Sequence, residues 1–341
     1  MKTREIILIT LLVLINSCKN NVSGPDNSGI PQLPALADSI PYTKLGSGKI
    51  AFQRIGPVNN SYEGTYVIDI NNQKSWGITL APIDGPQISP GGDMIAFTKY
   101  TDQTYAWDVY MTDTYGNNLT RISSVKGQEF CPFWFPDNKK IVYSSYSFNT
   151  NEVLPVYIYD INAGTTNEVM DLININYPYV YSPMDNICPS SHGILVTSLS
   201  GGKGICTFNE NGQYFKTIVN KSDGYNYYSS AWNPSGNKIA VMALKRDSLF
   251  IYTTEMNIIL FNSDGSDSTK IFTSADREIT TSWSGNSNYS LCWSPDGSKI
   301  LFNRREGYLT SHIYMINADG TGLTTVTSLT GVTDRSLSWG K

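Results

Sequence analysis

Histidine, the side chain best suited to proton transfer near neutral pH, is almost absent from this chain of 341 residues. Its two histidines are His192 and His312, so a metal cage built of several histidines is excluded. A Ser-His-Asp triad would have to use one of these two. The G-x-S-x-G sequence that presents the nucleophile of α/β-hydrolases does not occur. We therefore predict no catalytic residue, no metal site and no cofactor.

The carboxylates do not form a recognisable acid–base pair either. The stretch NSDGSDS at 262–268 holds several oxygen ligands and resembles a calcium loop, but it lacks the downstream glutamate. An Asn-x-Asp-Gly sequence also suits a hairpin turn, and we interpret it as one. Most other Asp and Glu residues fall in predicted turns, so no carboxylate pair for glycoside hydrolysis can be assigned.

Asp296 stands in the peptide CWSPDGSKILF, which could be a site or a piece of architecture. Degraded copies of this peptide recur along the chain, always with the isoleucine five positions after the proline. The position of Asp296 is occupied in those copies by Gly91, Asp137, Ser190 and Ser235, so the carboxylate is dispensable. Asp296 is therefore interpreted as a turn residue, not as a catalyst.

The copies define a repeated structural unit. Each consists of an apolar strand, a turn, an Ile-Ala-Phe-like strand, a variable loop, a third strand, an Asn/Asp-Gly turn and a Thr/Ile/Val-rich strand. Four-stranded units of this length indicate a β-propeller. The isoleucines are Ile50, Ile95, Ile141, Ile194, Ile239 and Ile300, and they predict an all-β, six-bladed propeller of four-stranded antiparallel blades over residues 48–341. The copy split between 49–52 and 337–341 predicts that the C-terminal strand closes the ring in blade one.

The repeats resemble the TolB-like propeller family, whose units carry a WSPDG-x-x-I-A-F core. WSPDGSKILF, WNPSGNKIAV and WFPDNKKIVY carry the resemblance, whereas ICPSSHGILV lacks the Trp, Asp and Gly. The resemblance implies a periplasmic propeller that binds a ligand or a protein. A separate domain precedes the propeller in TolB, so a role in the Tol-Pal machinery is not carried over. The WD-repeat family fits less well, because no Gly-His and Trp-Asp pair recurs.

The N-terminus predicts export. A short basic start, ten apolar residues and Ser17 before Cys18 resemble a bacterial lipoprotein signal over residues 1–17, with the lipid on Cys18. The alternative is an ordinary secretory signal with an incidental cysteine. Residues 18–47 are rich in Pro, Gly, Ser and Asn and predict a flexible tether. We expect a lipid-anchored protein on the periplasmic side of the outer membrane, with exposure on the cell surface as the alternative.

The charge and composition of the chain bear on which partners it could bind. The net charge is -4 and no run of Lys or Arg occurs, which gives no reason to expect nucleic acid. We expect a monomer that contacts the membrane through Cys18. Four further cysteines lack any paired or zinc-binding spacing and are interpreted mainly as buried free thiols: Cys131, Cys188, Cys206 and Cys292.

The second and fourth connections of each unit would share one face of the ring, which we call the loop face. These connections vary in length and are rich in Tyr, Trp and Arg, which suit recognition. The predicted binding residues are Tyr105, Trp107, Tyr179, Tyr225, Tyr227, Tyr228, Arg246, Trp283, Arg304, Arg305 and Tyr308. The competing interpretation is that several of the tyrosines pack between blades.

Three functions remain after these steps. We favour a non-enzymatic propeller that binds a protein, peptide or glycan of the cell envelope through the loop face. The alternative is a polysaccharide lyase or hydrolase that uses the same face, and a scaffold without a ligand is the third.

Overall fold

The computed structural model describes most of the predicted propeller. Its described residues are 32–33, 35–56, 63–78, 83–101, 106–123, 128–147, 152–170, 186–190, 193–197, 204–209, 211, 213–219, 225–246, 252–274, 278–279, 290–307 and 310–341. Residues 1–17 and Cys18 lie outside these ranges. No helix within them has the length and apolar character needed to cross a bilayer.

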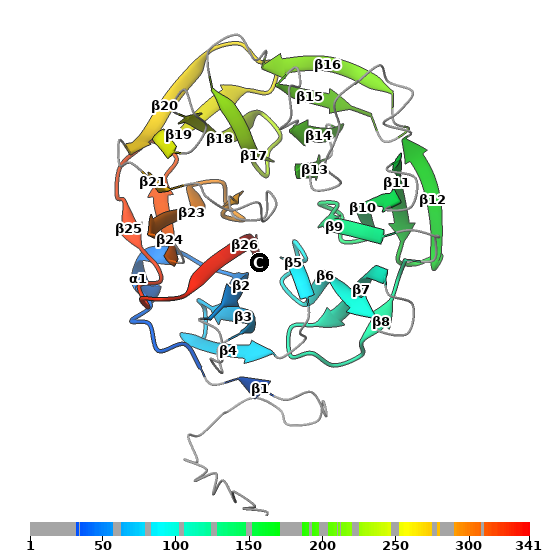
Figure 1. Ribbon diagram of the computed structural model, residues 1–341, viewed down its shortest axis with the longest axis horizontal. Helices are drawn as coiled ribbons and strands as arrows, with labels where there is room; N and C mark the ends of the chain where they lie inside the picture. Colours follow the sequence, from blue (N-terminus) through cyan, green and yellow to red (C-terminus); the bar gives the residue numbers. More distant parts are fainter. Residues whose placement is uncertain are drawn as a thin grey trace, which may run out of the picture.

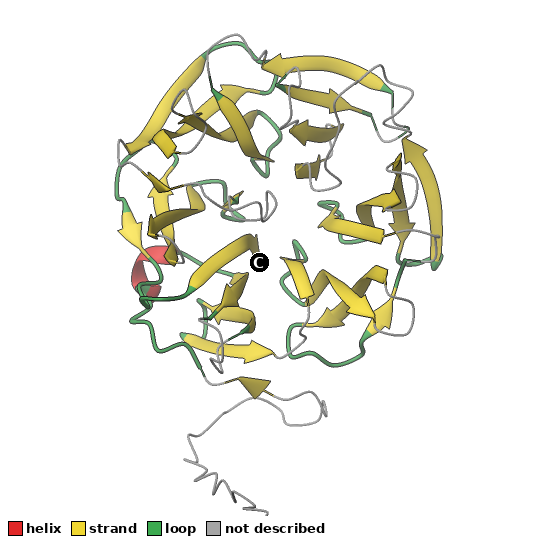
Figure 2. Cartoon of the chain, in the orientation of Figure 1, coloured by secondary structure: helices red, strands yellow, loops and turns green. Residues whose placement is uncertain are grey.

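Nearly all regular structure is β-strand, arranged around a common centre (Figure 1). Helix α1 (Tyr42–Leu45) is the one red element in Figure 2. Three sheets have four consecutive strands each. They are β5 (Ile83–Ile88), β6 (Met94–Thr101), β7 (Ala106–Asp113) and β8 (Thr120–Arg121); β9 (Gln128–Trp134), β10 (Lys140–Ser147), β11 (Glu152–Asp160) and β12 (Thr165–Met170); and β13 (Asn186–Ser190), β14 (Gly193–Thr197), β15 (Ile205–Phe208) and β16 (Tyr214–Val219).

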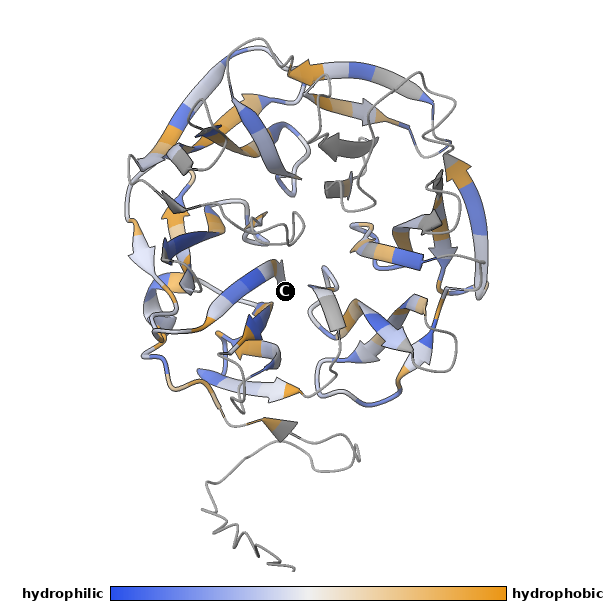
Figure 3. Cartoon of the chain, viewed as in Figure 1, coloured by the Kyte–Doolittle hydropathy of each residue, from blue (hydrophilic) through white to orange (hydrophobic). Residues whose placement is uncertain are grey.

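A fourth sheet adds a short edge strand to the same pattern. It contains β17 (Asn226–Trp232), β18 (Lys238–Arg246), β19 (Tyr252–Asn262) and β20 (Ser268–Ser274), with β21 (Glu278–Ile279) paired to β19. In these sheets the first strand lies nearest the centre and the fourth lies outermost (Figure 1). Hydrophobic and hydrophilic residues are interspersed along the strands, as expected for strands that pack through selected positions (Figure 3).

The fifth sheet joins the two ends of the chain. Its nine strands are β1 (Gln32–Leu33), β4 (Lys74–Ile78), β3 (Gly64–Asp69), β2 (Lys49–Ile55), β26 (Thr333–Gly340), β24 (Thr310–Asn317), β23 (Lys299–Gly307) and β22 (Leu291–Trp293), with β25 (Thr324–Thr325) paired to β24. Strand β26 runs antiparallel to β2, with Ile50 opposite Trp339. A single parallel pair, Ser311 with Thr333, connects β24 to β26. In the described part of the chain no sheet closes on itself.

The repeated peptide forms the turn between the first two strands of a unit. In the copy at 292–302, the Gly297 amide donates to the Ser294 carbonyl at 2.9 Å, and Gly297 has a φ of 71°. The Asp296 carboxylate accepts the Ser298 amide at 3.0 Å and the Ser294 hydroxyl at 2.6 Å. Burial opposes ionisation of Asp296, but these hydrogen bonds prevail and lower its pKa. The interpretation of Asp296 as a turn residue is confirmed.

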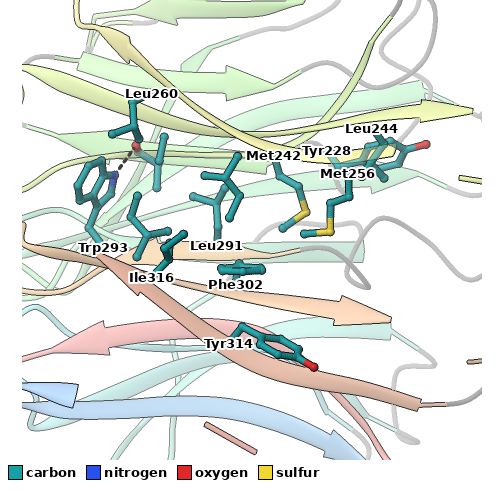
Figure 4. Close-up of a cluster of buried hydrophobic side chains, with 14 residues drawn as sticks. Tyr228, Met242, Leu244, Met256, Leu260, Leu291, Trp293, Phe302, Tyr314 and Ile316 are labelled. Atoms are coloured by element: carbon teal, nitrogen blue, oxygen red, sulfur yellow. Dashed lines mark hydrogen bonds between the residues drawn. The ribbon is translucent and has the colours of Figure 1, made fainter. Parts of the chain in front are cut away.

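The tryptophan of the repeat connects neighbouring sheets. Trp293 Nε1 donates to the Ala231 carbonyl of β17 at 3.0 Å, and Trp134 Nε1 donates to the Gln87 carbonyl of β5 at 2.9 Å. Figure 4 shows Trp293 beside Leu260, Leu291 and Ile316 in the apolar layer between two sheets. The isoleucines of the repeat whose side chains are described are fully buried: Ile50, Ile95, Ile141, Ile239 and Ile300. The repeat is therefore the packing unit of the fold.

The segment 18–47, predicted as a flexible tether, is partly packed against the sheets. Strand β1 pairs with β4, with Gln32 opposite Ile78. Leu45 is fully buried, and Leu36 and Ile40 pack on the same cluster. The prediction is wrong for the described residues between 32 and 47, because apolar residues spaced through a proline-rich stretch cover an apolar surface of the propeller.

Candidate functional site

The strand ends next to the second connections carry the side chains that can meet a ligand. This is the predicted loop face, and its described part includes the start of β7, the end of β18, the start of β19 and the end of β23. The opposite ends of the strands meet at the regular turns, which we call the turn face. Chemistry at the loop face therefore depends on which side chains the strand ends hold in place.

Trp107 lies at the start of β7 and is half-buried. Its ring contacts Tyr100 at a centroid distance of 5.4 Å and Phe130 at 6.2 Å. Its backbone amide donates to Gln128 Oε1 at 2.8 Å. Trp107 thus joins β6, β7 and β9 and keeps part of its surface available at the loop face.

Tyr225 belongs to a cluster with two lysines and a glutamate, which we call the lysine cluster. Its hydroxyl donates to Glu255 Oε1 at 3.1 Å, and Lys245 Nζ lies 4.7 Å from the ring centroid. Lys270 Nζ lies 3.1 Å from Glu255 Oε1 and 3.3 Å from the Tyr225 hydroxyl. Lys245 Nζ is 3.6 Å from Glu255 Oε2. Strand register explains this convergence, because Lys245 lies directly opposite Glu255.

Hydrogen bonds centred on the buried Asn257 hold Glu255 in position. Asn257 Nδ2 donates to Glu255 Oε1 at 2.8 Å, and Thr273 Oγ1 donates to Asn257 Oδ1 at 2.9 Å. The bond from Asn257, with those from Lys270 and Tyr225, lowers the pKa of Glu255 to about 2. Hydrogen bonding to Tyr225 raises the pKa of Lys245, and hydrogen bonding to Glu255 raises that of Lys270. The cluster therefore stays charged over the physiological range.

Tyr227 and Tyr228 lie in the hydrophobic core and not at the surface. Tyr227 is 2% exposed and packs with Ile205 and Val241, whereas Tyr228 is 8% exposed and packs with Met242. The labelled Tyr228 lies in the apolar layer of Figure 4. Their prediction as ligand contacts is corrected here, because alternation along β17 sends the two rings into cores on opposite sides of the sheet.

The predicted arginines have different environments. Arg304 is half-buried, with its guanidinium carbon 5.9 Å from the Tyr314 ring centroid, and Arg305 is also half-buried. Arg246 is the last residue of β18, and its side chain lies outside the described part of the chain. Four other predicted residues lie outside the described residues: Tyr105, Tyr179, Trp283 and Tyr308.

A pair of buried carboxyl groups, Asp108 of β7 and Glu129 of β9, was missed by the sequence reasoning. Their exposed fractions are 1% and 0%. Arg121 Nη2 lies 2.7 Å from Asp108 Oδ1, whereas neither carboxyl oxygen of Glu129 accepts a hydrogen bond from a described donor. Burial, with a contribution from Asp108, raises the pKa of Glu129 to about 8. A glutamate within the apolar stretch QEFCPFW was the available signal.

A second buried charge cluster joins the chain ends. Arg54 donates to both oxygens of Asp334, from Nε at 2.7 Å and Nη2 at 2.8 Å. Its Nη1 donates to Asp38 Oδ2 at 2.8 Å. All three side chains are inaccessible to solvent. The cluster fastens the N-terminal segment and β26 to β2, so its role is structural.

The remaining groups with catalytic potential are also engaged or buried. His312 is 5% exposed, with Nδ1 3.1 Å from Glu306 Oε2 and Nε2 3.1 Å from the Leu329 carbonyl oxygen. His192 lies outside the described residues. Cys188, Cys206 and Cys292 are free thiols, and burial raises the pKa of Cys188 to about 11. The side chain of Cys131 is not described. Among the described residues no three His, Cys, Asp or Glu side chains group as metal ligands.

The fold is similar to that of several solved structures. TolB from Acinetobacter baumannii matches with a TM-score of 0.64 and 17% identity, over 86% of this chain and 66% of that chain. Hydrazine synthase from Kuenenia stuttgartiensis matches with a TM-score of 0.58 and 13% identity, over 86% and 46%. An oligogalacturonate lyase in complex with manganese matches with a TM-score of 0.53 and 12% identity, over 88% and 86%. The chain thus covers less than two thirds of the TolB and hydrazine synthase chains.

The structure and these neighbours define a TolB-like β-propeller fold. This confirms the all-β propeller predicted from the repeat. The chain matches no protein-family model and no curated protein. Two of these neighbours, hydrazine synthase and oligogalacturonate lyase, carry the names of enzymes and TolB does not, so the shared fold is compatible with binding and with catalysis.

Proposed function

We propose that this protein is a non-enzymatic binding propeller of the bacterial cell envelope, which recognises a protein, peptide or glycan through the loop face. The lysine cluster carries the proposal. It holds an aromatic ring and two ammonium groups in fixed positions before any ligand arrives, which lowers the entropic cost of recognition. The side chains of Lys245 and Lys270 are each 42% exposed, so both remain accessible.

The charge of the cluster favours an acidic group on the ligand. Two ammonium groups face one carboxylate, which leaves one net positive charge at a partly exposed site. A carboxylate of a peptide or an acidic sugar could contact both lysines beside the Tyr225 ring. Half-buried Trp107 offers a second aromatic surface on the same face.

The proposal includes the finer architecture predicted from the repeat. The nine-stranded sheet divides naturally at the single parallel pair between β24 and β26. One part, β26-β2-β3-β4, and the other, β22 to β25, would then be two blades. With the remaining four sheets this makes six blades, and the antiparallel pairing of β26 with β2 supports closure of the ring in blade one.

Lipid anchoring through Cys18 also belongs to the proposal. The motif ending at Cys18 supports it, and the expected position is the periplasmic side of the outer membrane, as a monomer. Metabolic labelling with a fatty-acid analogue tests this. We expect the label on the wild type and not on Cys18→Ser; equal labelling of both would disprove the anchor.

Capture of an envelope component by the soluble propeller tests the binding function. Lys245→Gln with Lys270→Gln should reduce capture at least tenfold, because both ammonium groups are lost. Lys238→Gln is the matched control. It lies on the same strand β18, but at the turn face, where its Nζ donates to Asn262 Oδ1 at 2.7 Å. Equal capture by the paired variant and the control would refute the proposal.

A polysaccharide lyase or hydrolase is the second candidate. The observation that favours it is the carboxyl pair, because a raised glutamate pKa next to a second carboxylate is one requirement of general acid catalysis. Both groups are buried, so catalysis would also require an opening that admits the glycan. A panel of acidic and neutral glycans, incubated with the purified protein, is the test. Turnover that is abolished in Glu129→Gln would establish the enzyme, and its absence across the panel would remove this candidate.

A further inference from the structure

The buried carboxyl pair also suggests a structural role, separate from the catalytic role considered above. Glu129 is fully buried at the loop-face end of β9, next to Asp108 of β7. These two strands belong to different sheets. Two ionised carboxylates have no hydrogen atom to share and repel each other in a buried site. A proton or a cation must therefore compensate the negative charge of the pair.

The groups around Glu129 show whether the protein itself supplies the positive charge that would compensate the two carboxylates. Arg121 of β8 is 2.7 Å from Asp108, and both Arg121 and the Ser123 hydroxyl favour the ionised form of Glu129 without outweighing its burial. Lys99 of β6 directs its ammonium toward the Tyr110 ring, 5.9 Å from the centroid. Tyr143 of β10 and Tyr157 of β11 are the other titratable groups near Glu129, and both are neutral at physiological pH because burial raises their pKa values.

Charge balance favours a proton over a metal ion. Arg121 and Asp108 cancel, so an ionised Glu129 would leave one buried negative charge. A divalent cation at the pair would reverse the imbalance and leave one positive charge beside the Arg121 guanidinium. A single proton on Glu129 makes the group neutral, and it supplies the hydrogen that a bond to the Asp108 carboxylate requires.

The pair is also placed to control the aromatic surface of the loop face. Glu129 lies between Gln128, which accepts the Trp107 amide, and Phe130, which contacts the Trp107 ring. Asp108 is the residue next to Trp107 in β7. Separation of the two carboxyl groups would therefore release the contacts that position Trp107.

We propose that one proton shared by Glu129 and Asp108 fastens β7 to β9, and that its loss loosens the two strands and Trp107. The folded site raises the pKa of Glu129 from 4.5 to about 8, while an opened site restores the ordinary value. The shared proton therefore stabilises the closed site fully below pH 4.5. As the pH rises from 4.5 towards 8, the equilibrium constant for closing the site falls by up to tenfold per pH unit. Above pH 8 the stabilisation is lost and the equilibrium constant no longer changes.

Amide hydrogen exchange of Trp107 measures this opening directly. The Ile313 amide, which donates to Thr327 Oγ1 at 3.0 Å, is the internal reference that removes the intrinsic dependence of exchange on hydroxide. We expect the ratio of the Trp107 rate to the Ile313 rate to rise by up to tenfold per pH unit from pH 5 to pH 8, and then to level off. The carboxyl carbon resonance of Glu129, followed in the same samples, should titrate near pH 8.

Two variants and added metal distinguish a shared proton from a bound cation and from a structural effect of the glutamate. Glu129→Gln keeps a hydrogen-bond donor that cannot ionise, so its ratio should stay constant. Glu168→Gln, an exposed carboxyl group of the same sheet, should behave as the wild type. A constant ratio in the wild type, an unchanged rise in Glu129→Gln, or titration of Glu129 near its ordinary pKa would overturn the proposal. A shift of the ratio on adding calcium or EDTA would also overturn it, because a cation would then occupy the pair.

Discussion

Arg54 places a positive charge where solvent does not reach it, and two carboxylates compensate that charge. Asp334 makes a bidentate contact, and its second oxygen also accepts the Thr327 hydroxyl at 2.6 Å. Asp38 accepts the amides of Ser328 and Leu329 in addition to the arginine. Burial raises the pKa of Asp334 although Arg54 opposes this rise. At the residue scale, loss of the arginine would thus leave buried acidic groups without a partner.

Replacing Arg54 with leucine should lower the free energy of unfolding by about 3–5 kcal/mol, as expected when one partner of a buried ion pair is removed. Urea denaturation of the purified propeller measures this. Lys74→Gln, at the exposed first residue of β4 in the same sheet, is the control and should change stability by less than about 0.5 kcal/mol. A loss below about 1 kcal/mol for Arg54→Leu would show that the cluster does not fasten the chain ends.

At the scale of the strands, some sequence patterns were sufficient to locate the elements and others were not. Alternating apolar residues and the spacing from Pro to Ile located the first two strands of the units, because both patterns follow from local geometry. The burial of Tyr227 and Tyr228 could not be predicted from these local patterns, since it depends on the packing of the neighbouring sheets. Likewise, Glu129 and Asp108 are far apart in the sequence, and only the packing of β7 against β9 brings them together.

Trp293 tests the contact between neighbouring sheets. Trp293→Phe keeps an aromatic ring but removes the hydrogen bond to the Ala231 carbonyl and leaves space in the apolar layer. We expect a loss of about 2 kcal/mol in the free energy of unfolding. The thermal unfolding midpoint measures this loss. Tyr115→Phe, at a turn-face position, is the control with which the midpoint is compared. Equal midpoints would contradict a role for the repeat tryptophan in joining sheets.

At the scale of the whole molecule, the chain ends meet in one sheet. The split repeat predicted the partners of β26 because its two halves complete one unit. The packing of the described residues between 32 and 47 was not predicted, since the proline-rich composition indicated a tether in spite of Leu36, Ile40 and Leu45. The loop face was located from the sequence as a region, but the lysine cluster within it required the register of β18 and β19.

Deleting residues 333–341 removes β26 and exposes one edge of β2. We expect a protein that unfolds at a much lower temperature or aggregates, because an open edge and an exposed core replace a paired strand. Deleting only Lys341 leaves β26 intact and is the control. Thermal unfolding followed by circular dichroism decides the question, and a truncated protein with the wild-type midpoint would argue against closure by β26.

Hydroxyl-radical footprinting of the propeller, with and without an envelope extract, tests the binding face most directly. The proposed function predicts protection of Trp107, Tyr225, Lys245 and Lys270 at the loop face, with unchanged labelling around Asp296 and Asp264 at the turn face. Protection confined to the turn face, or no protection at any position, would contradict recognition through the loop face.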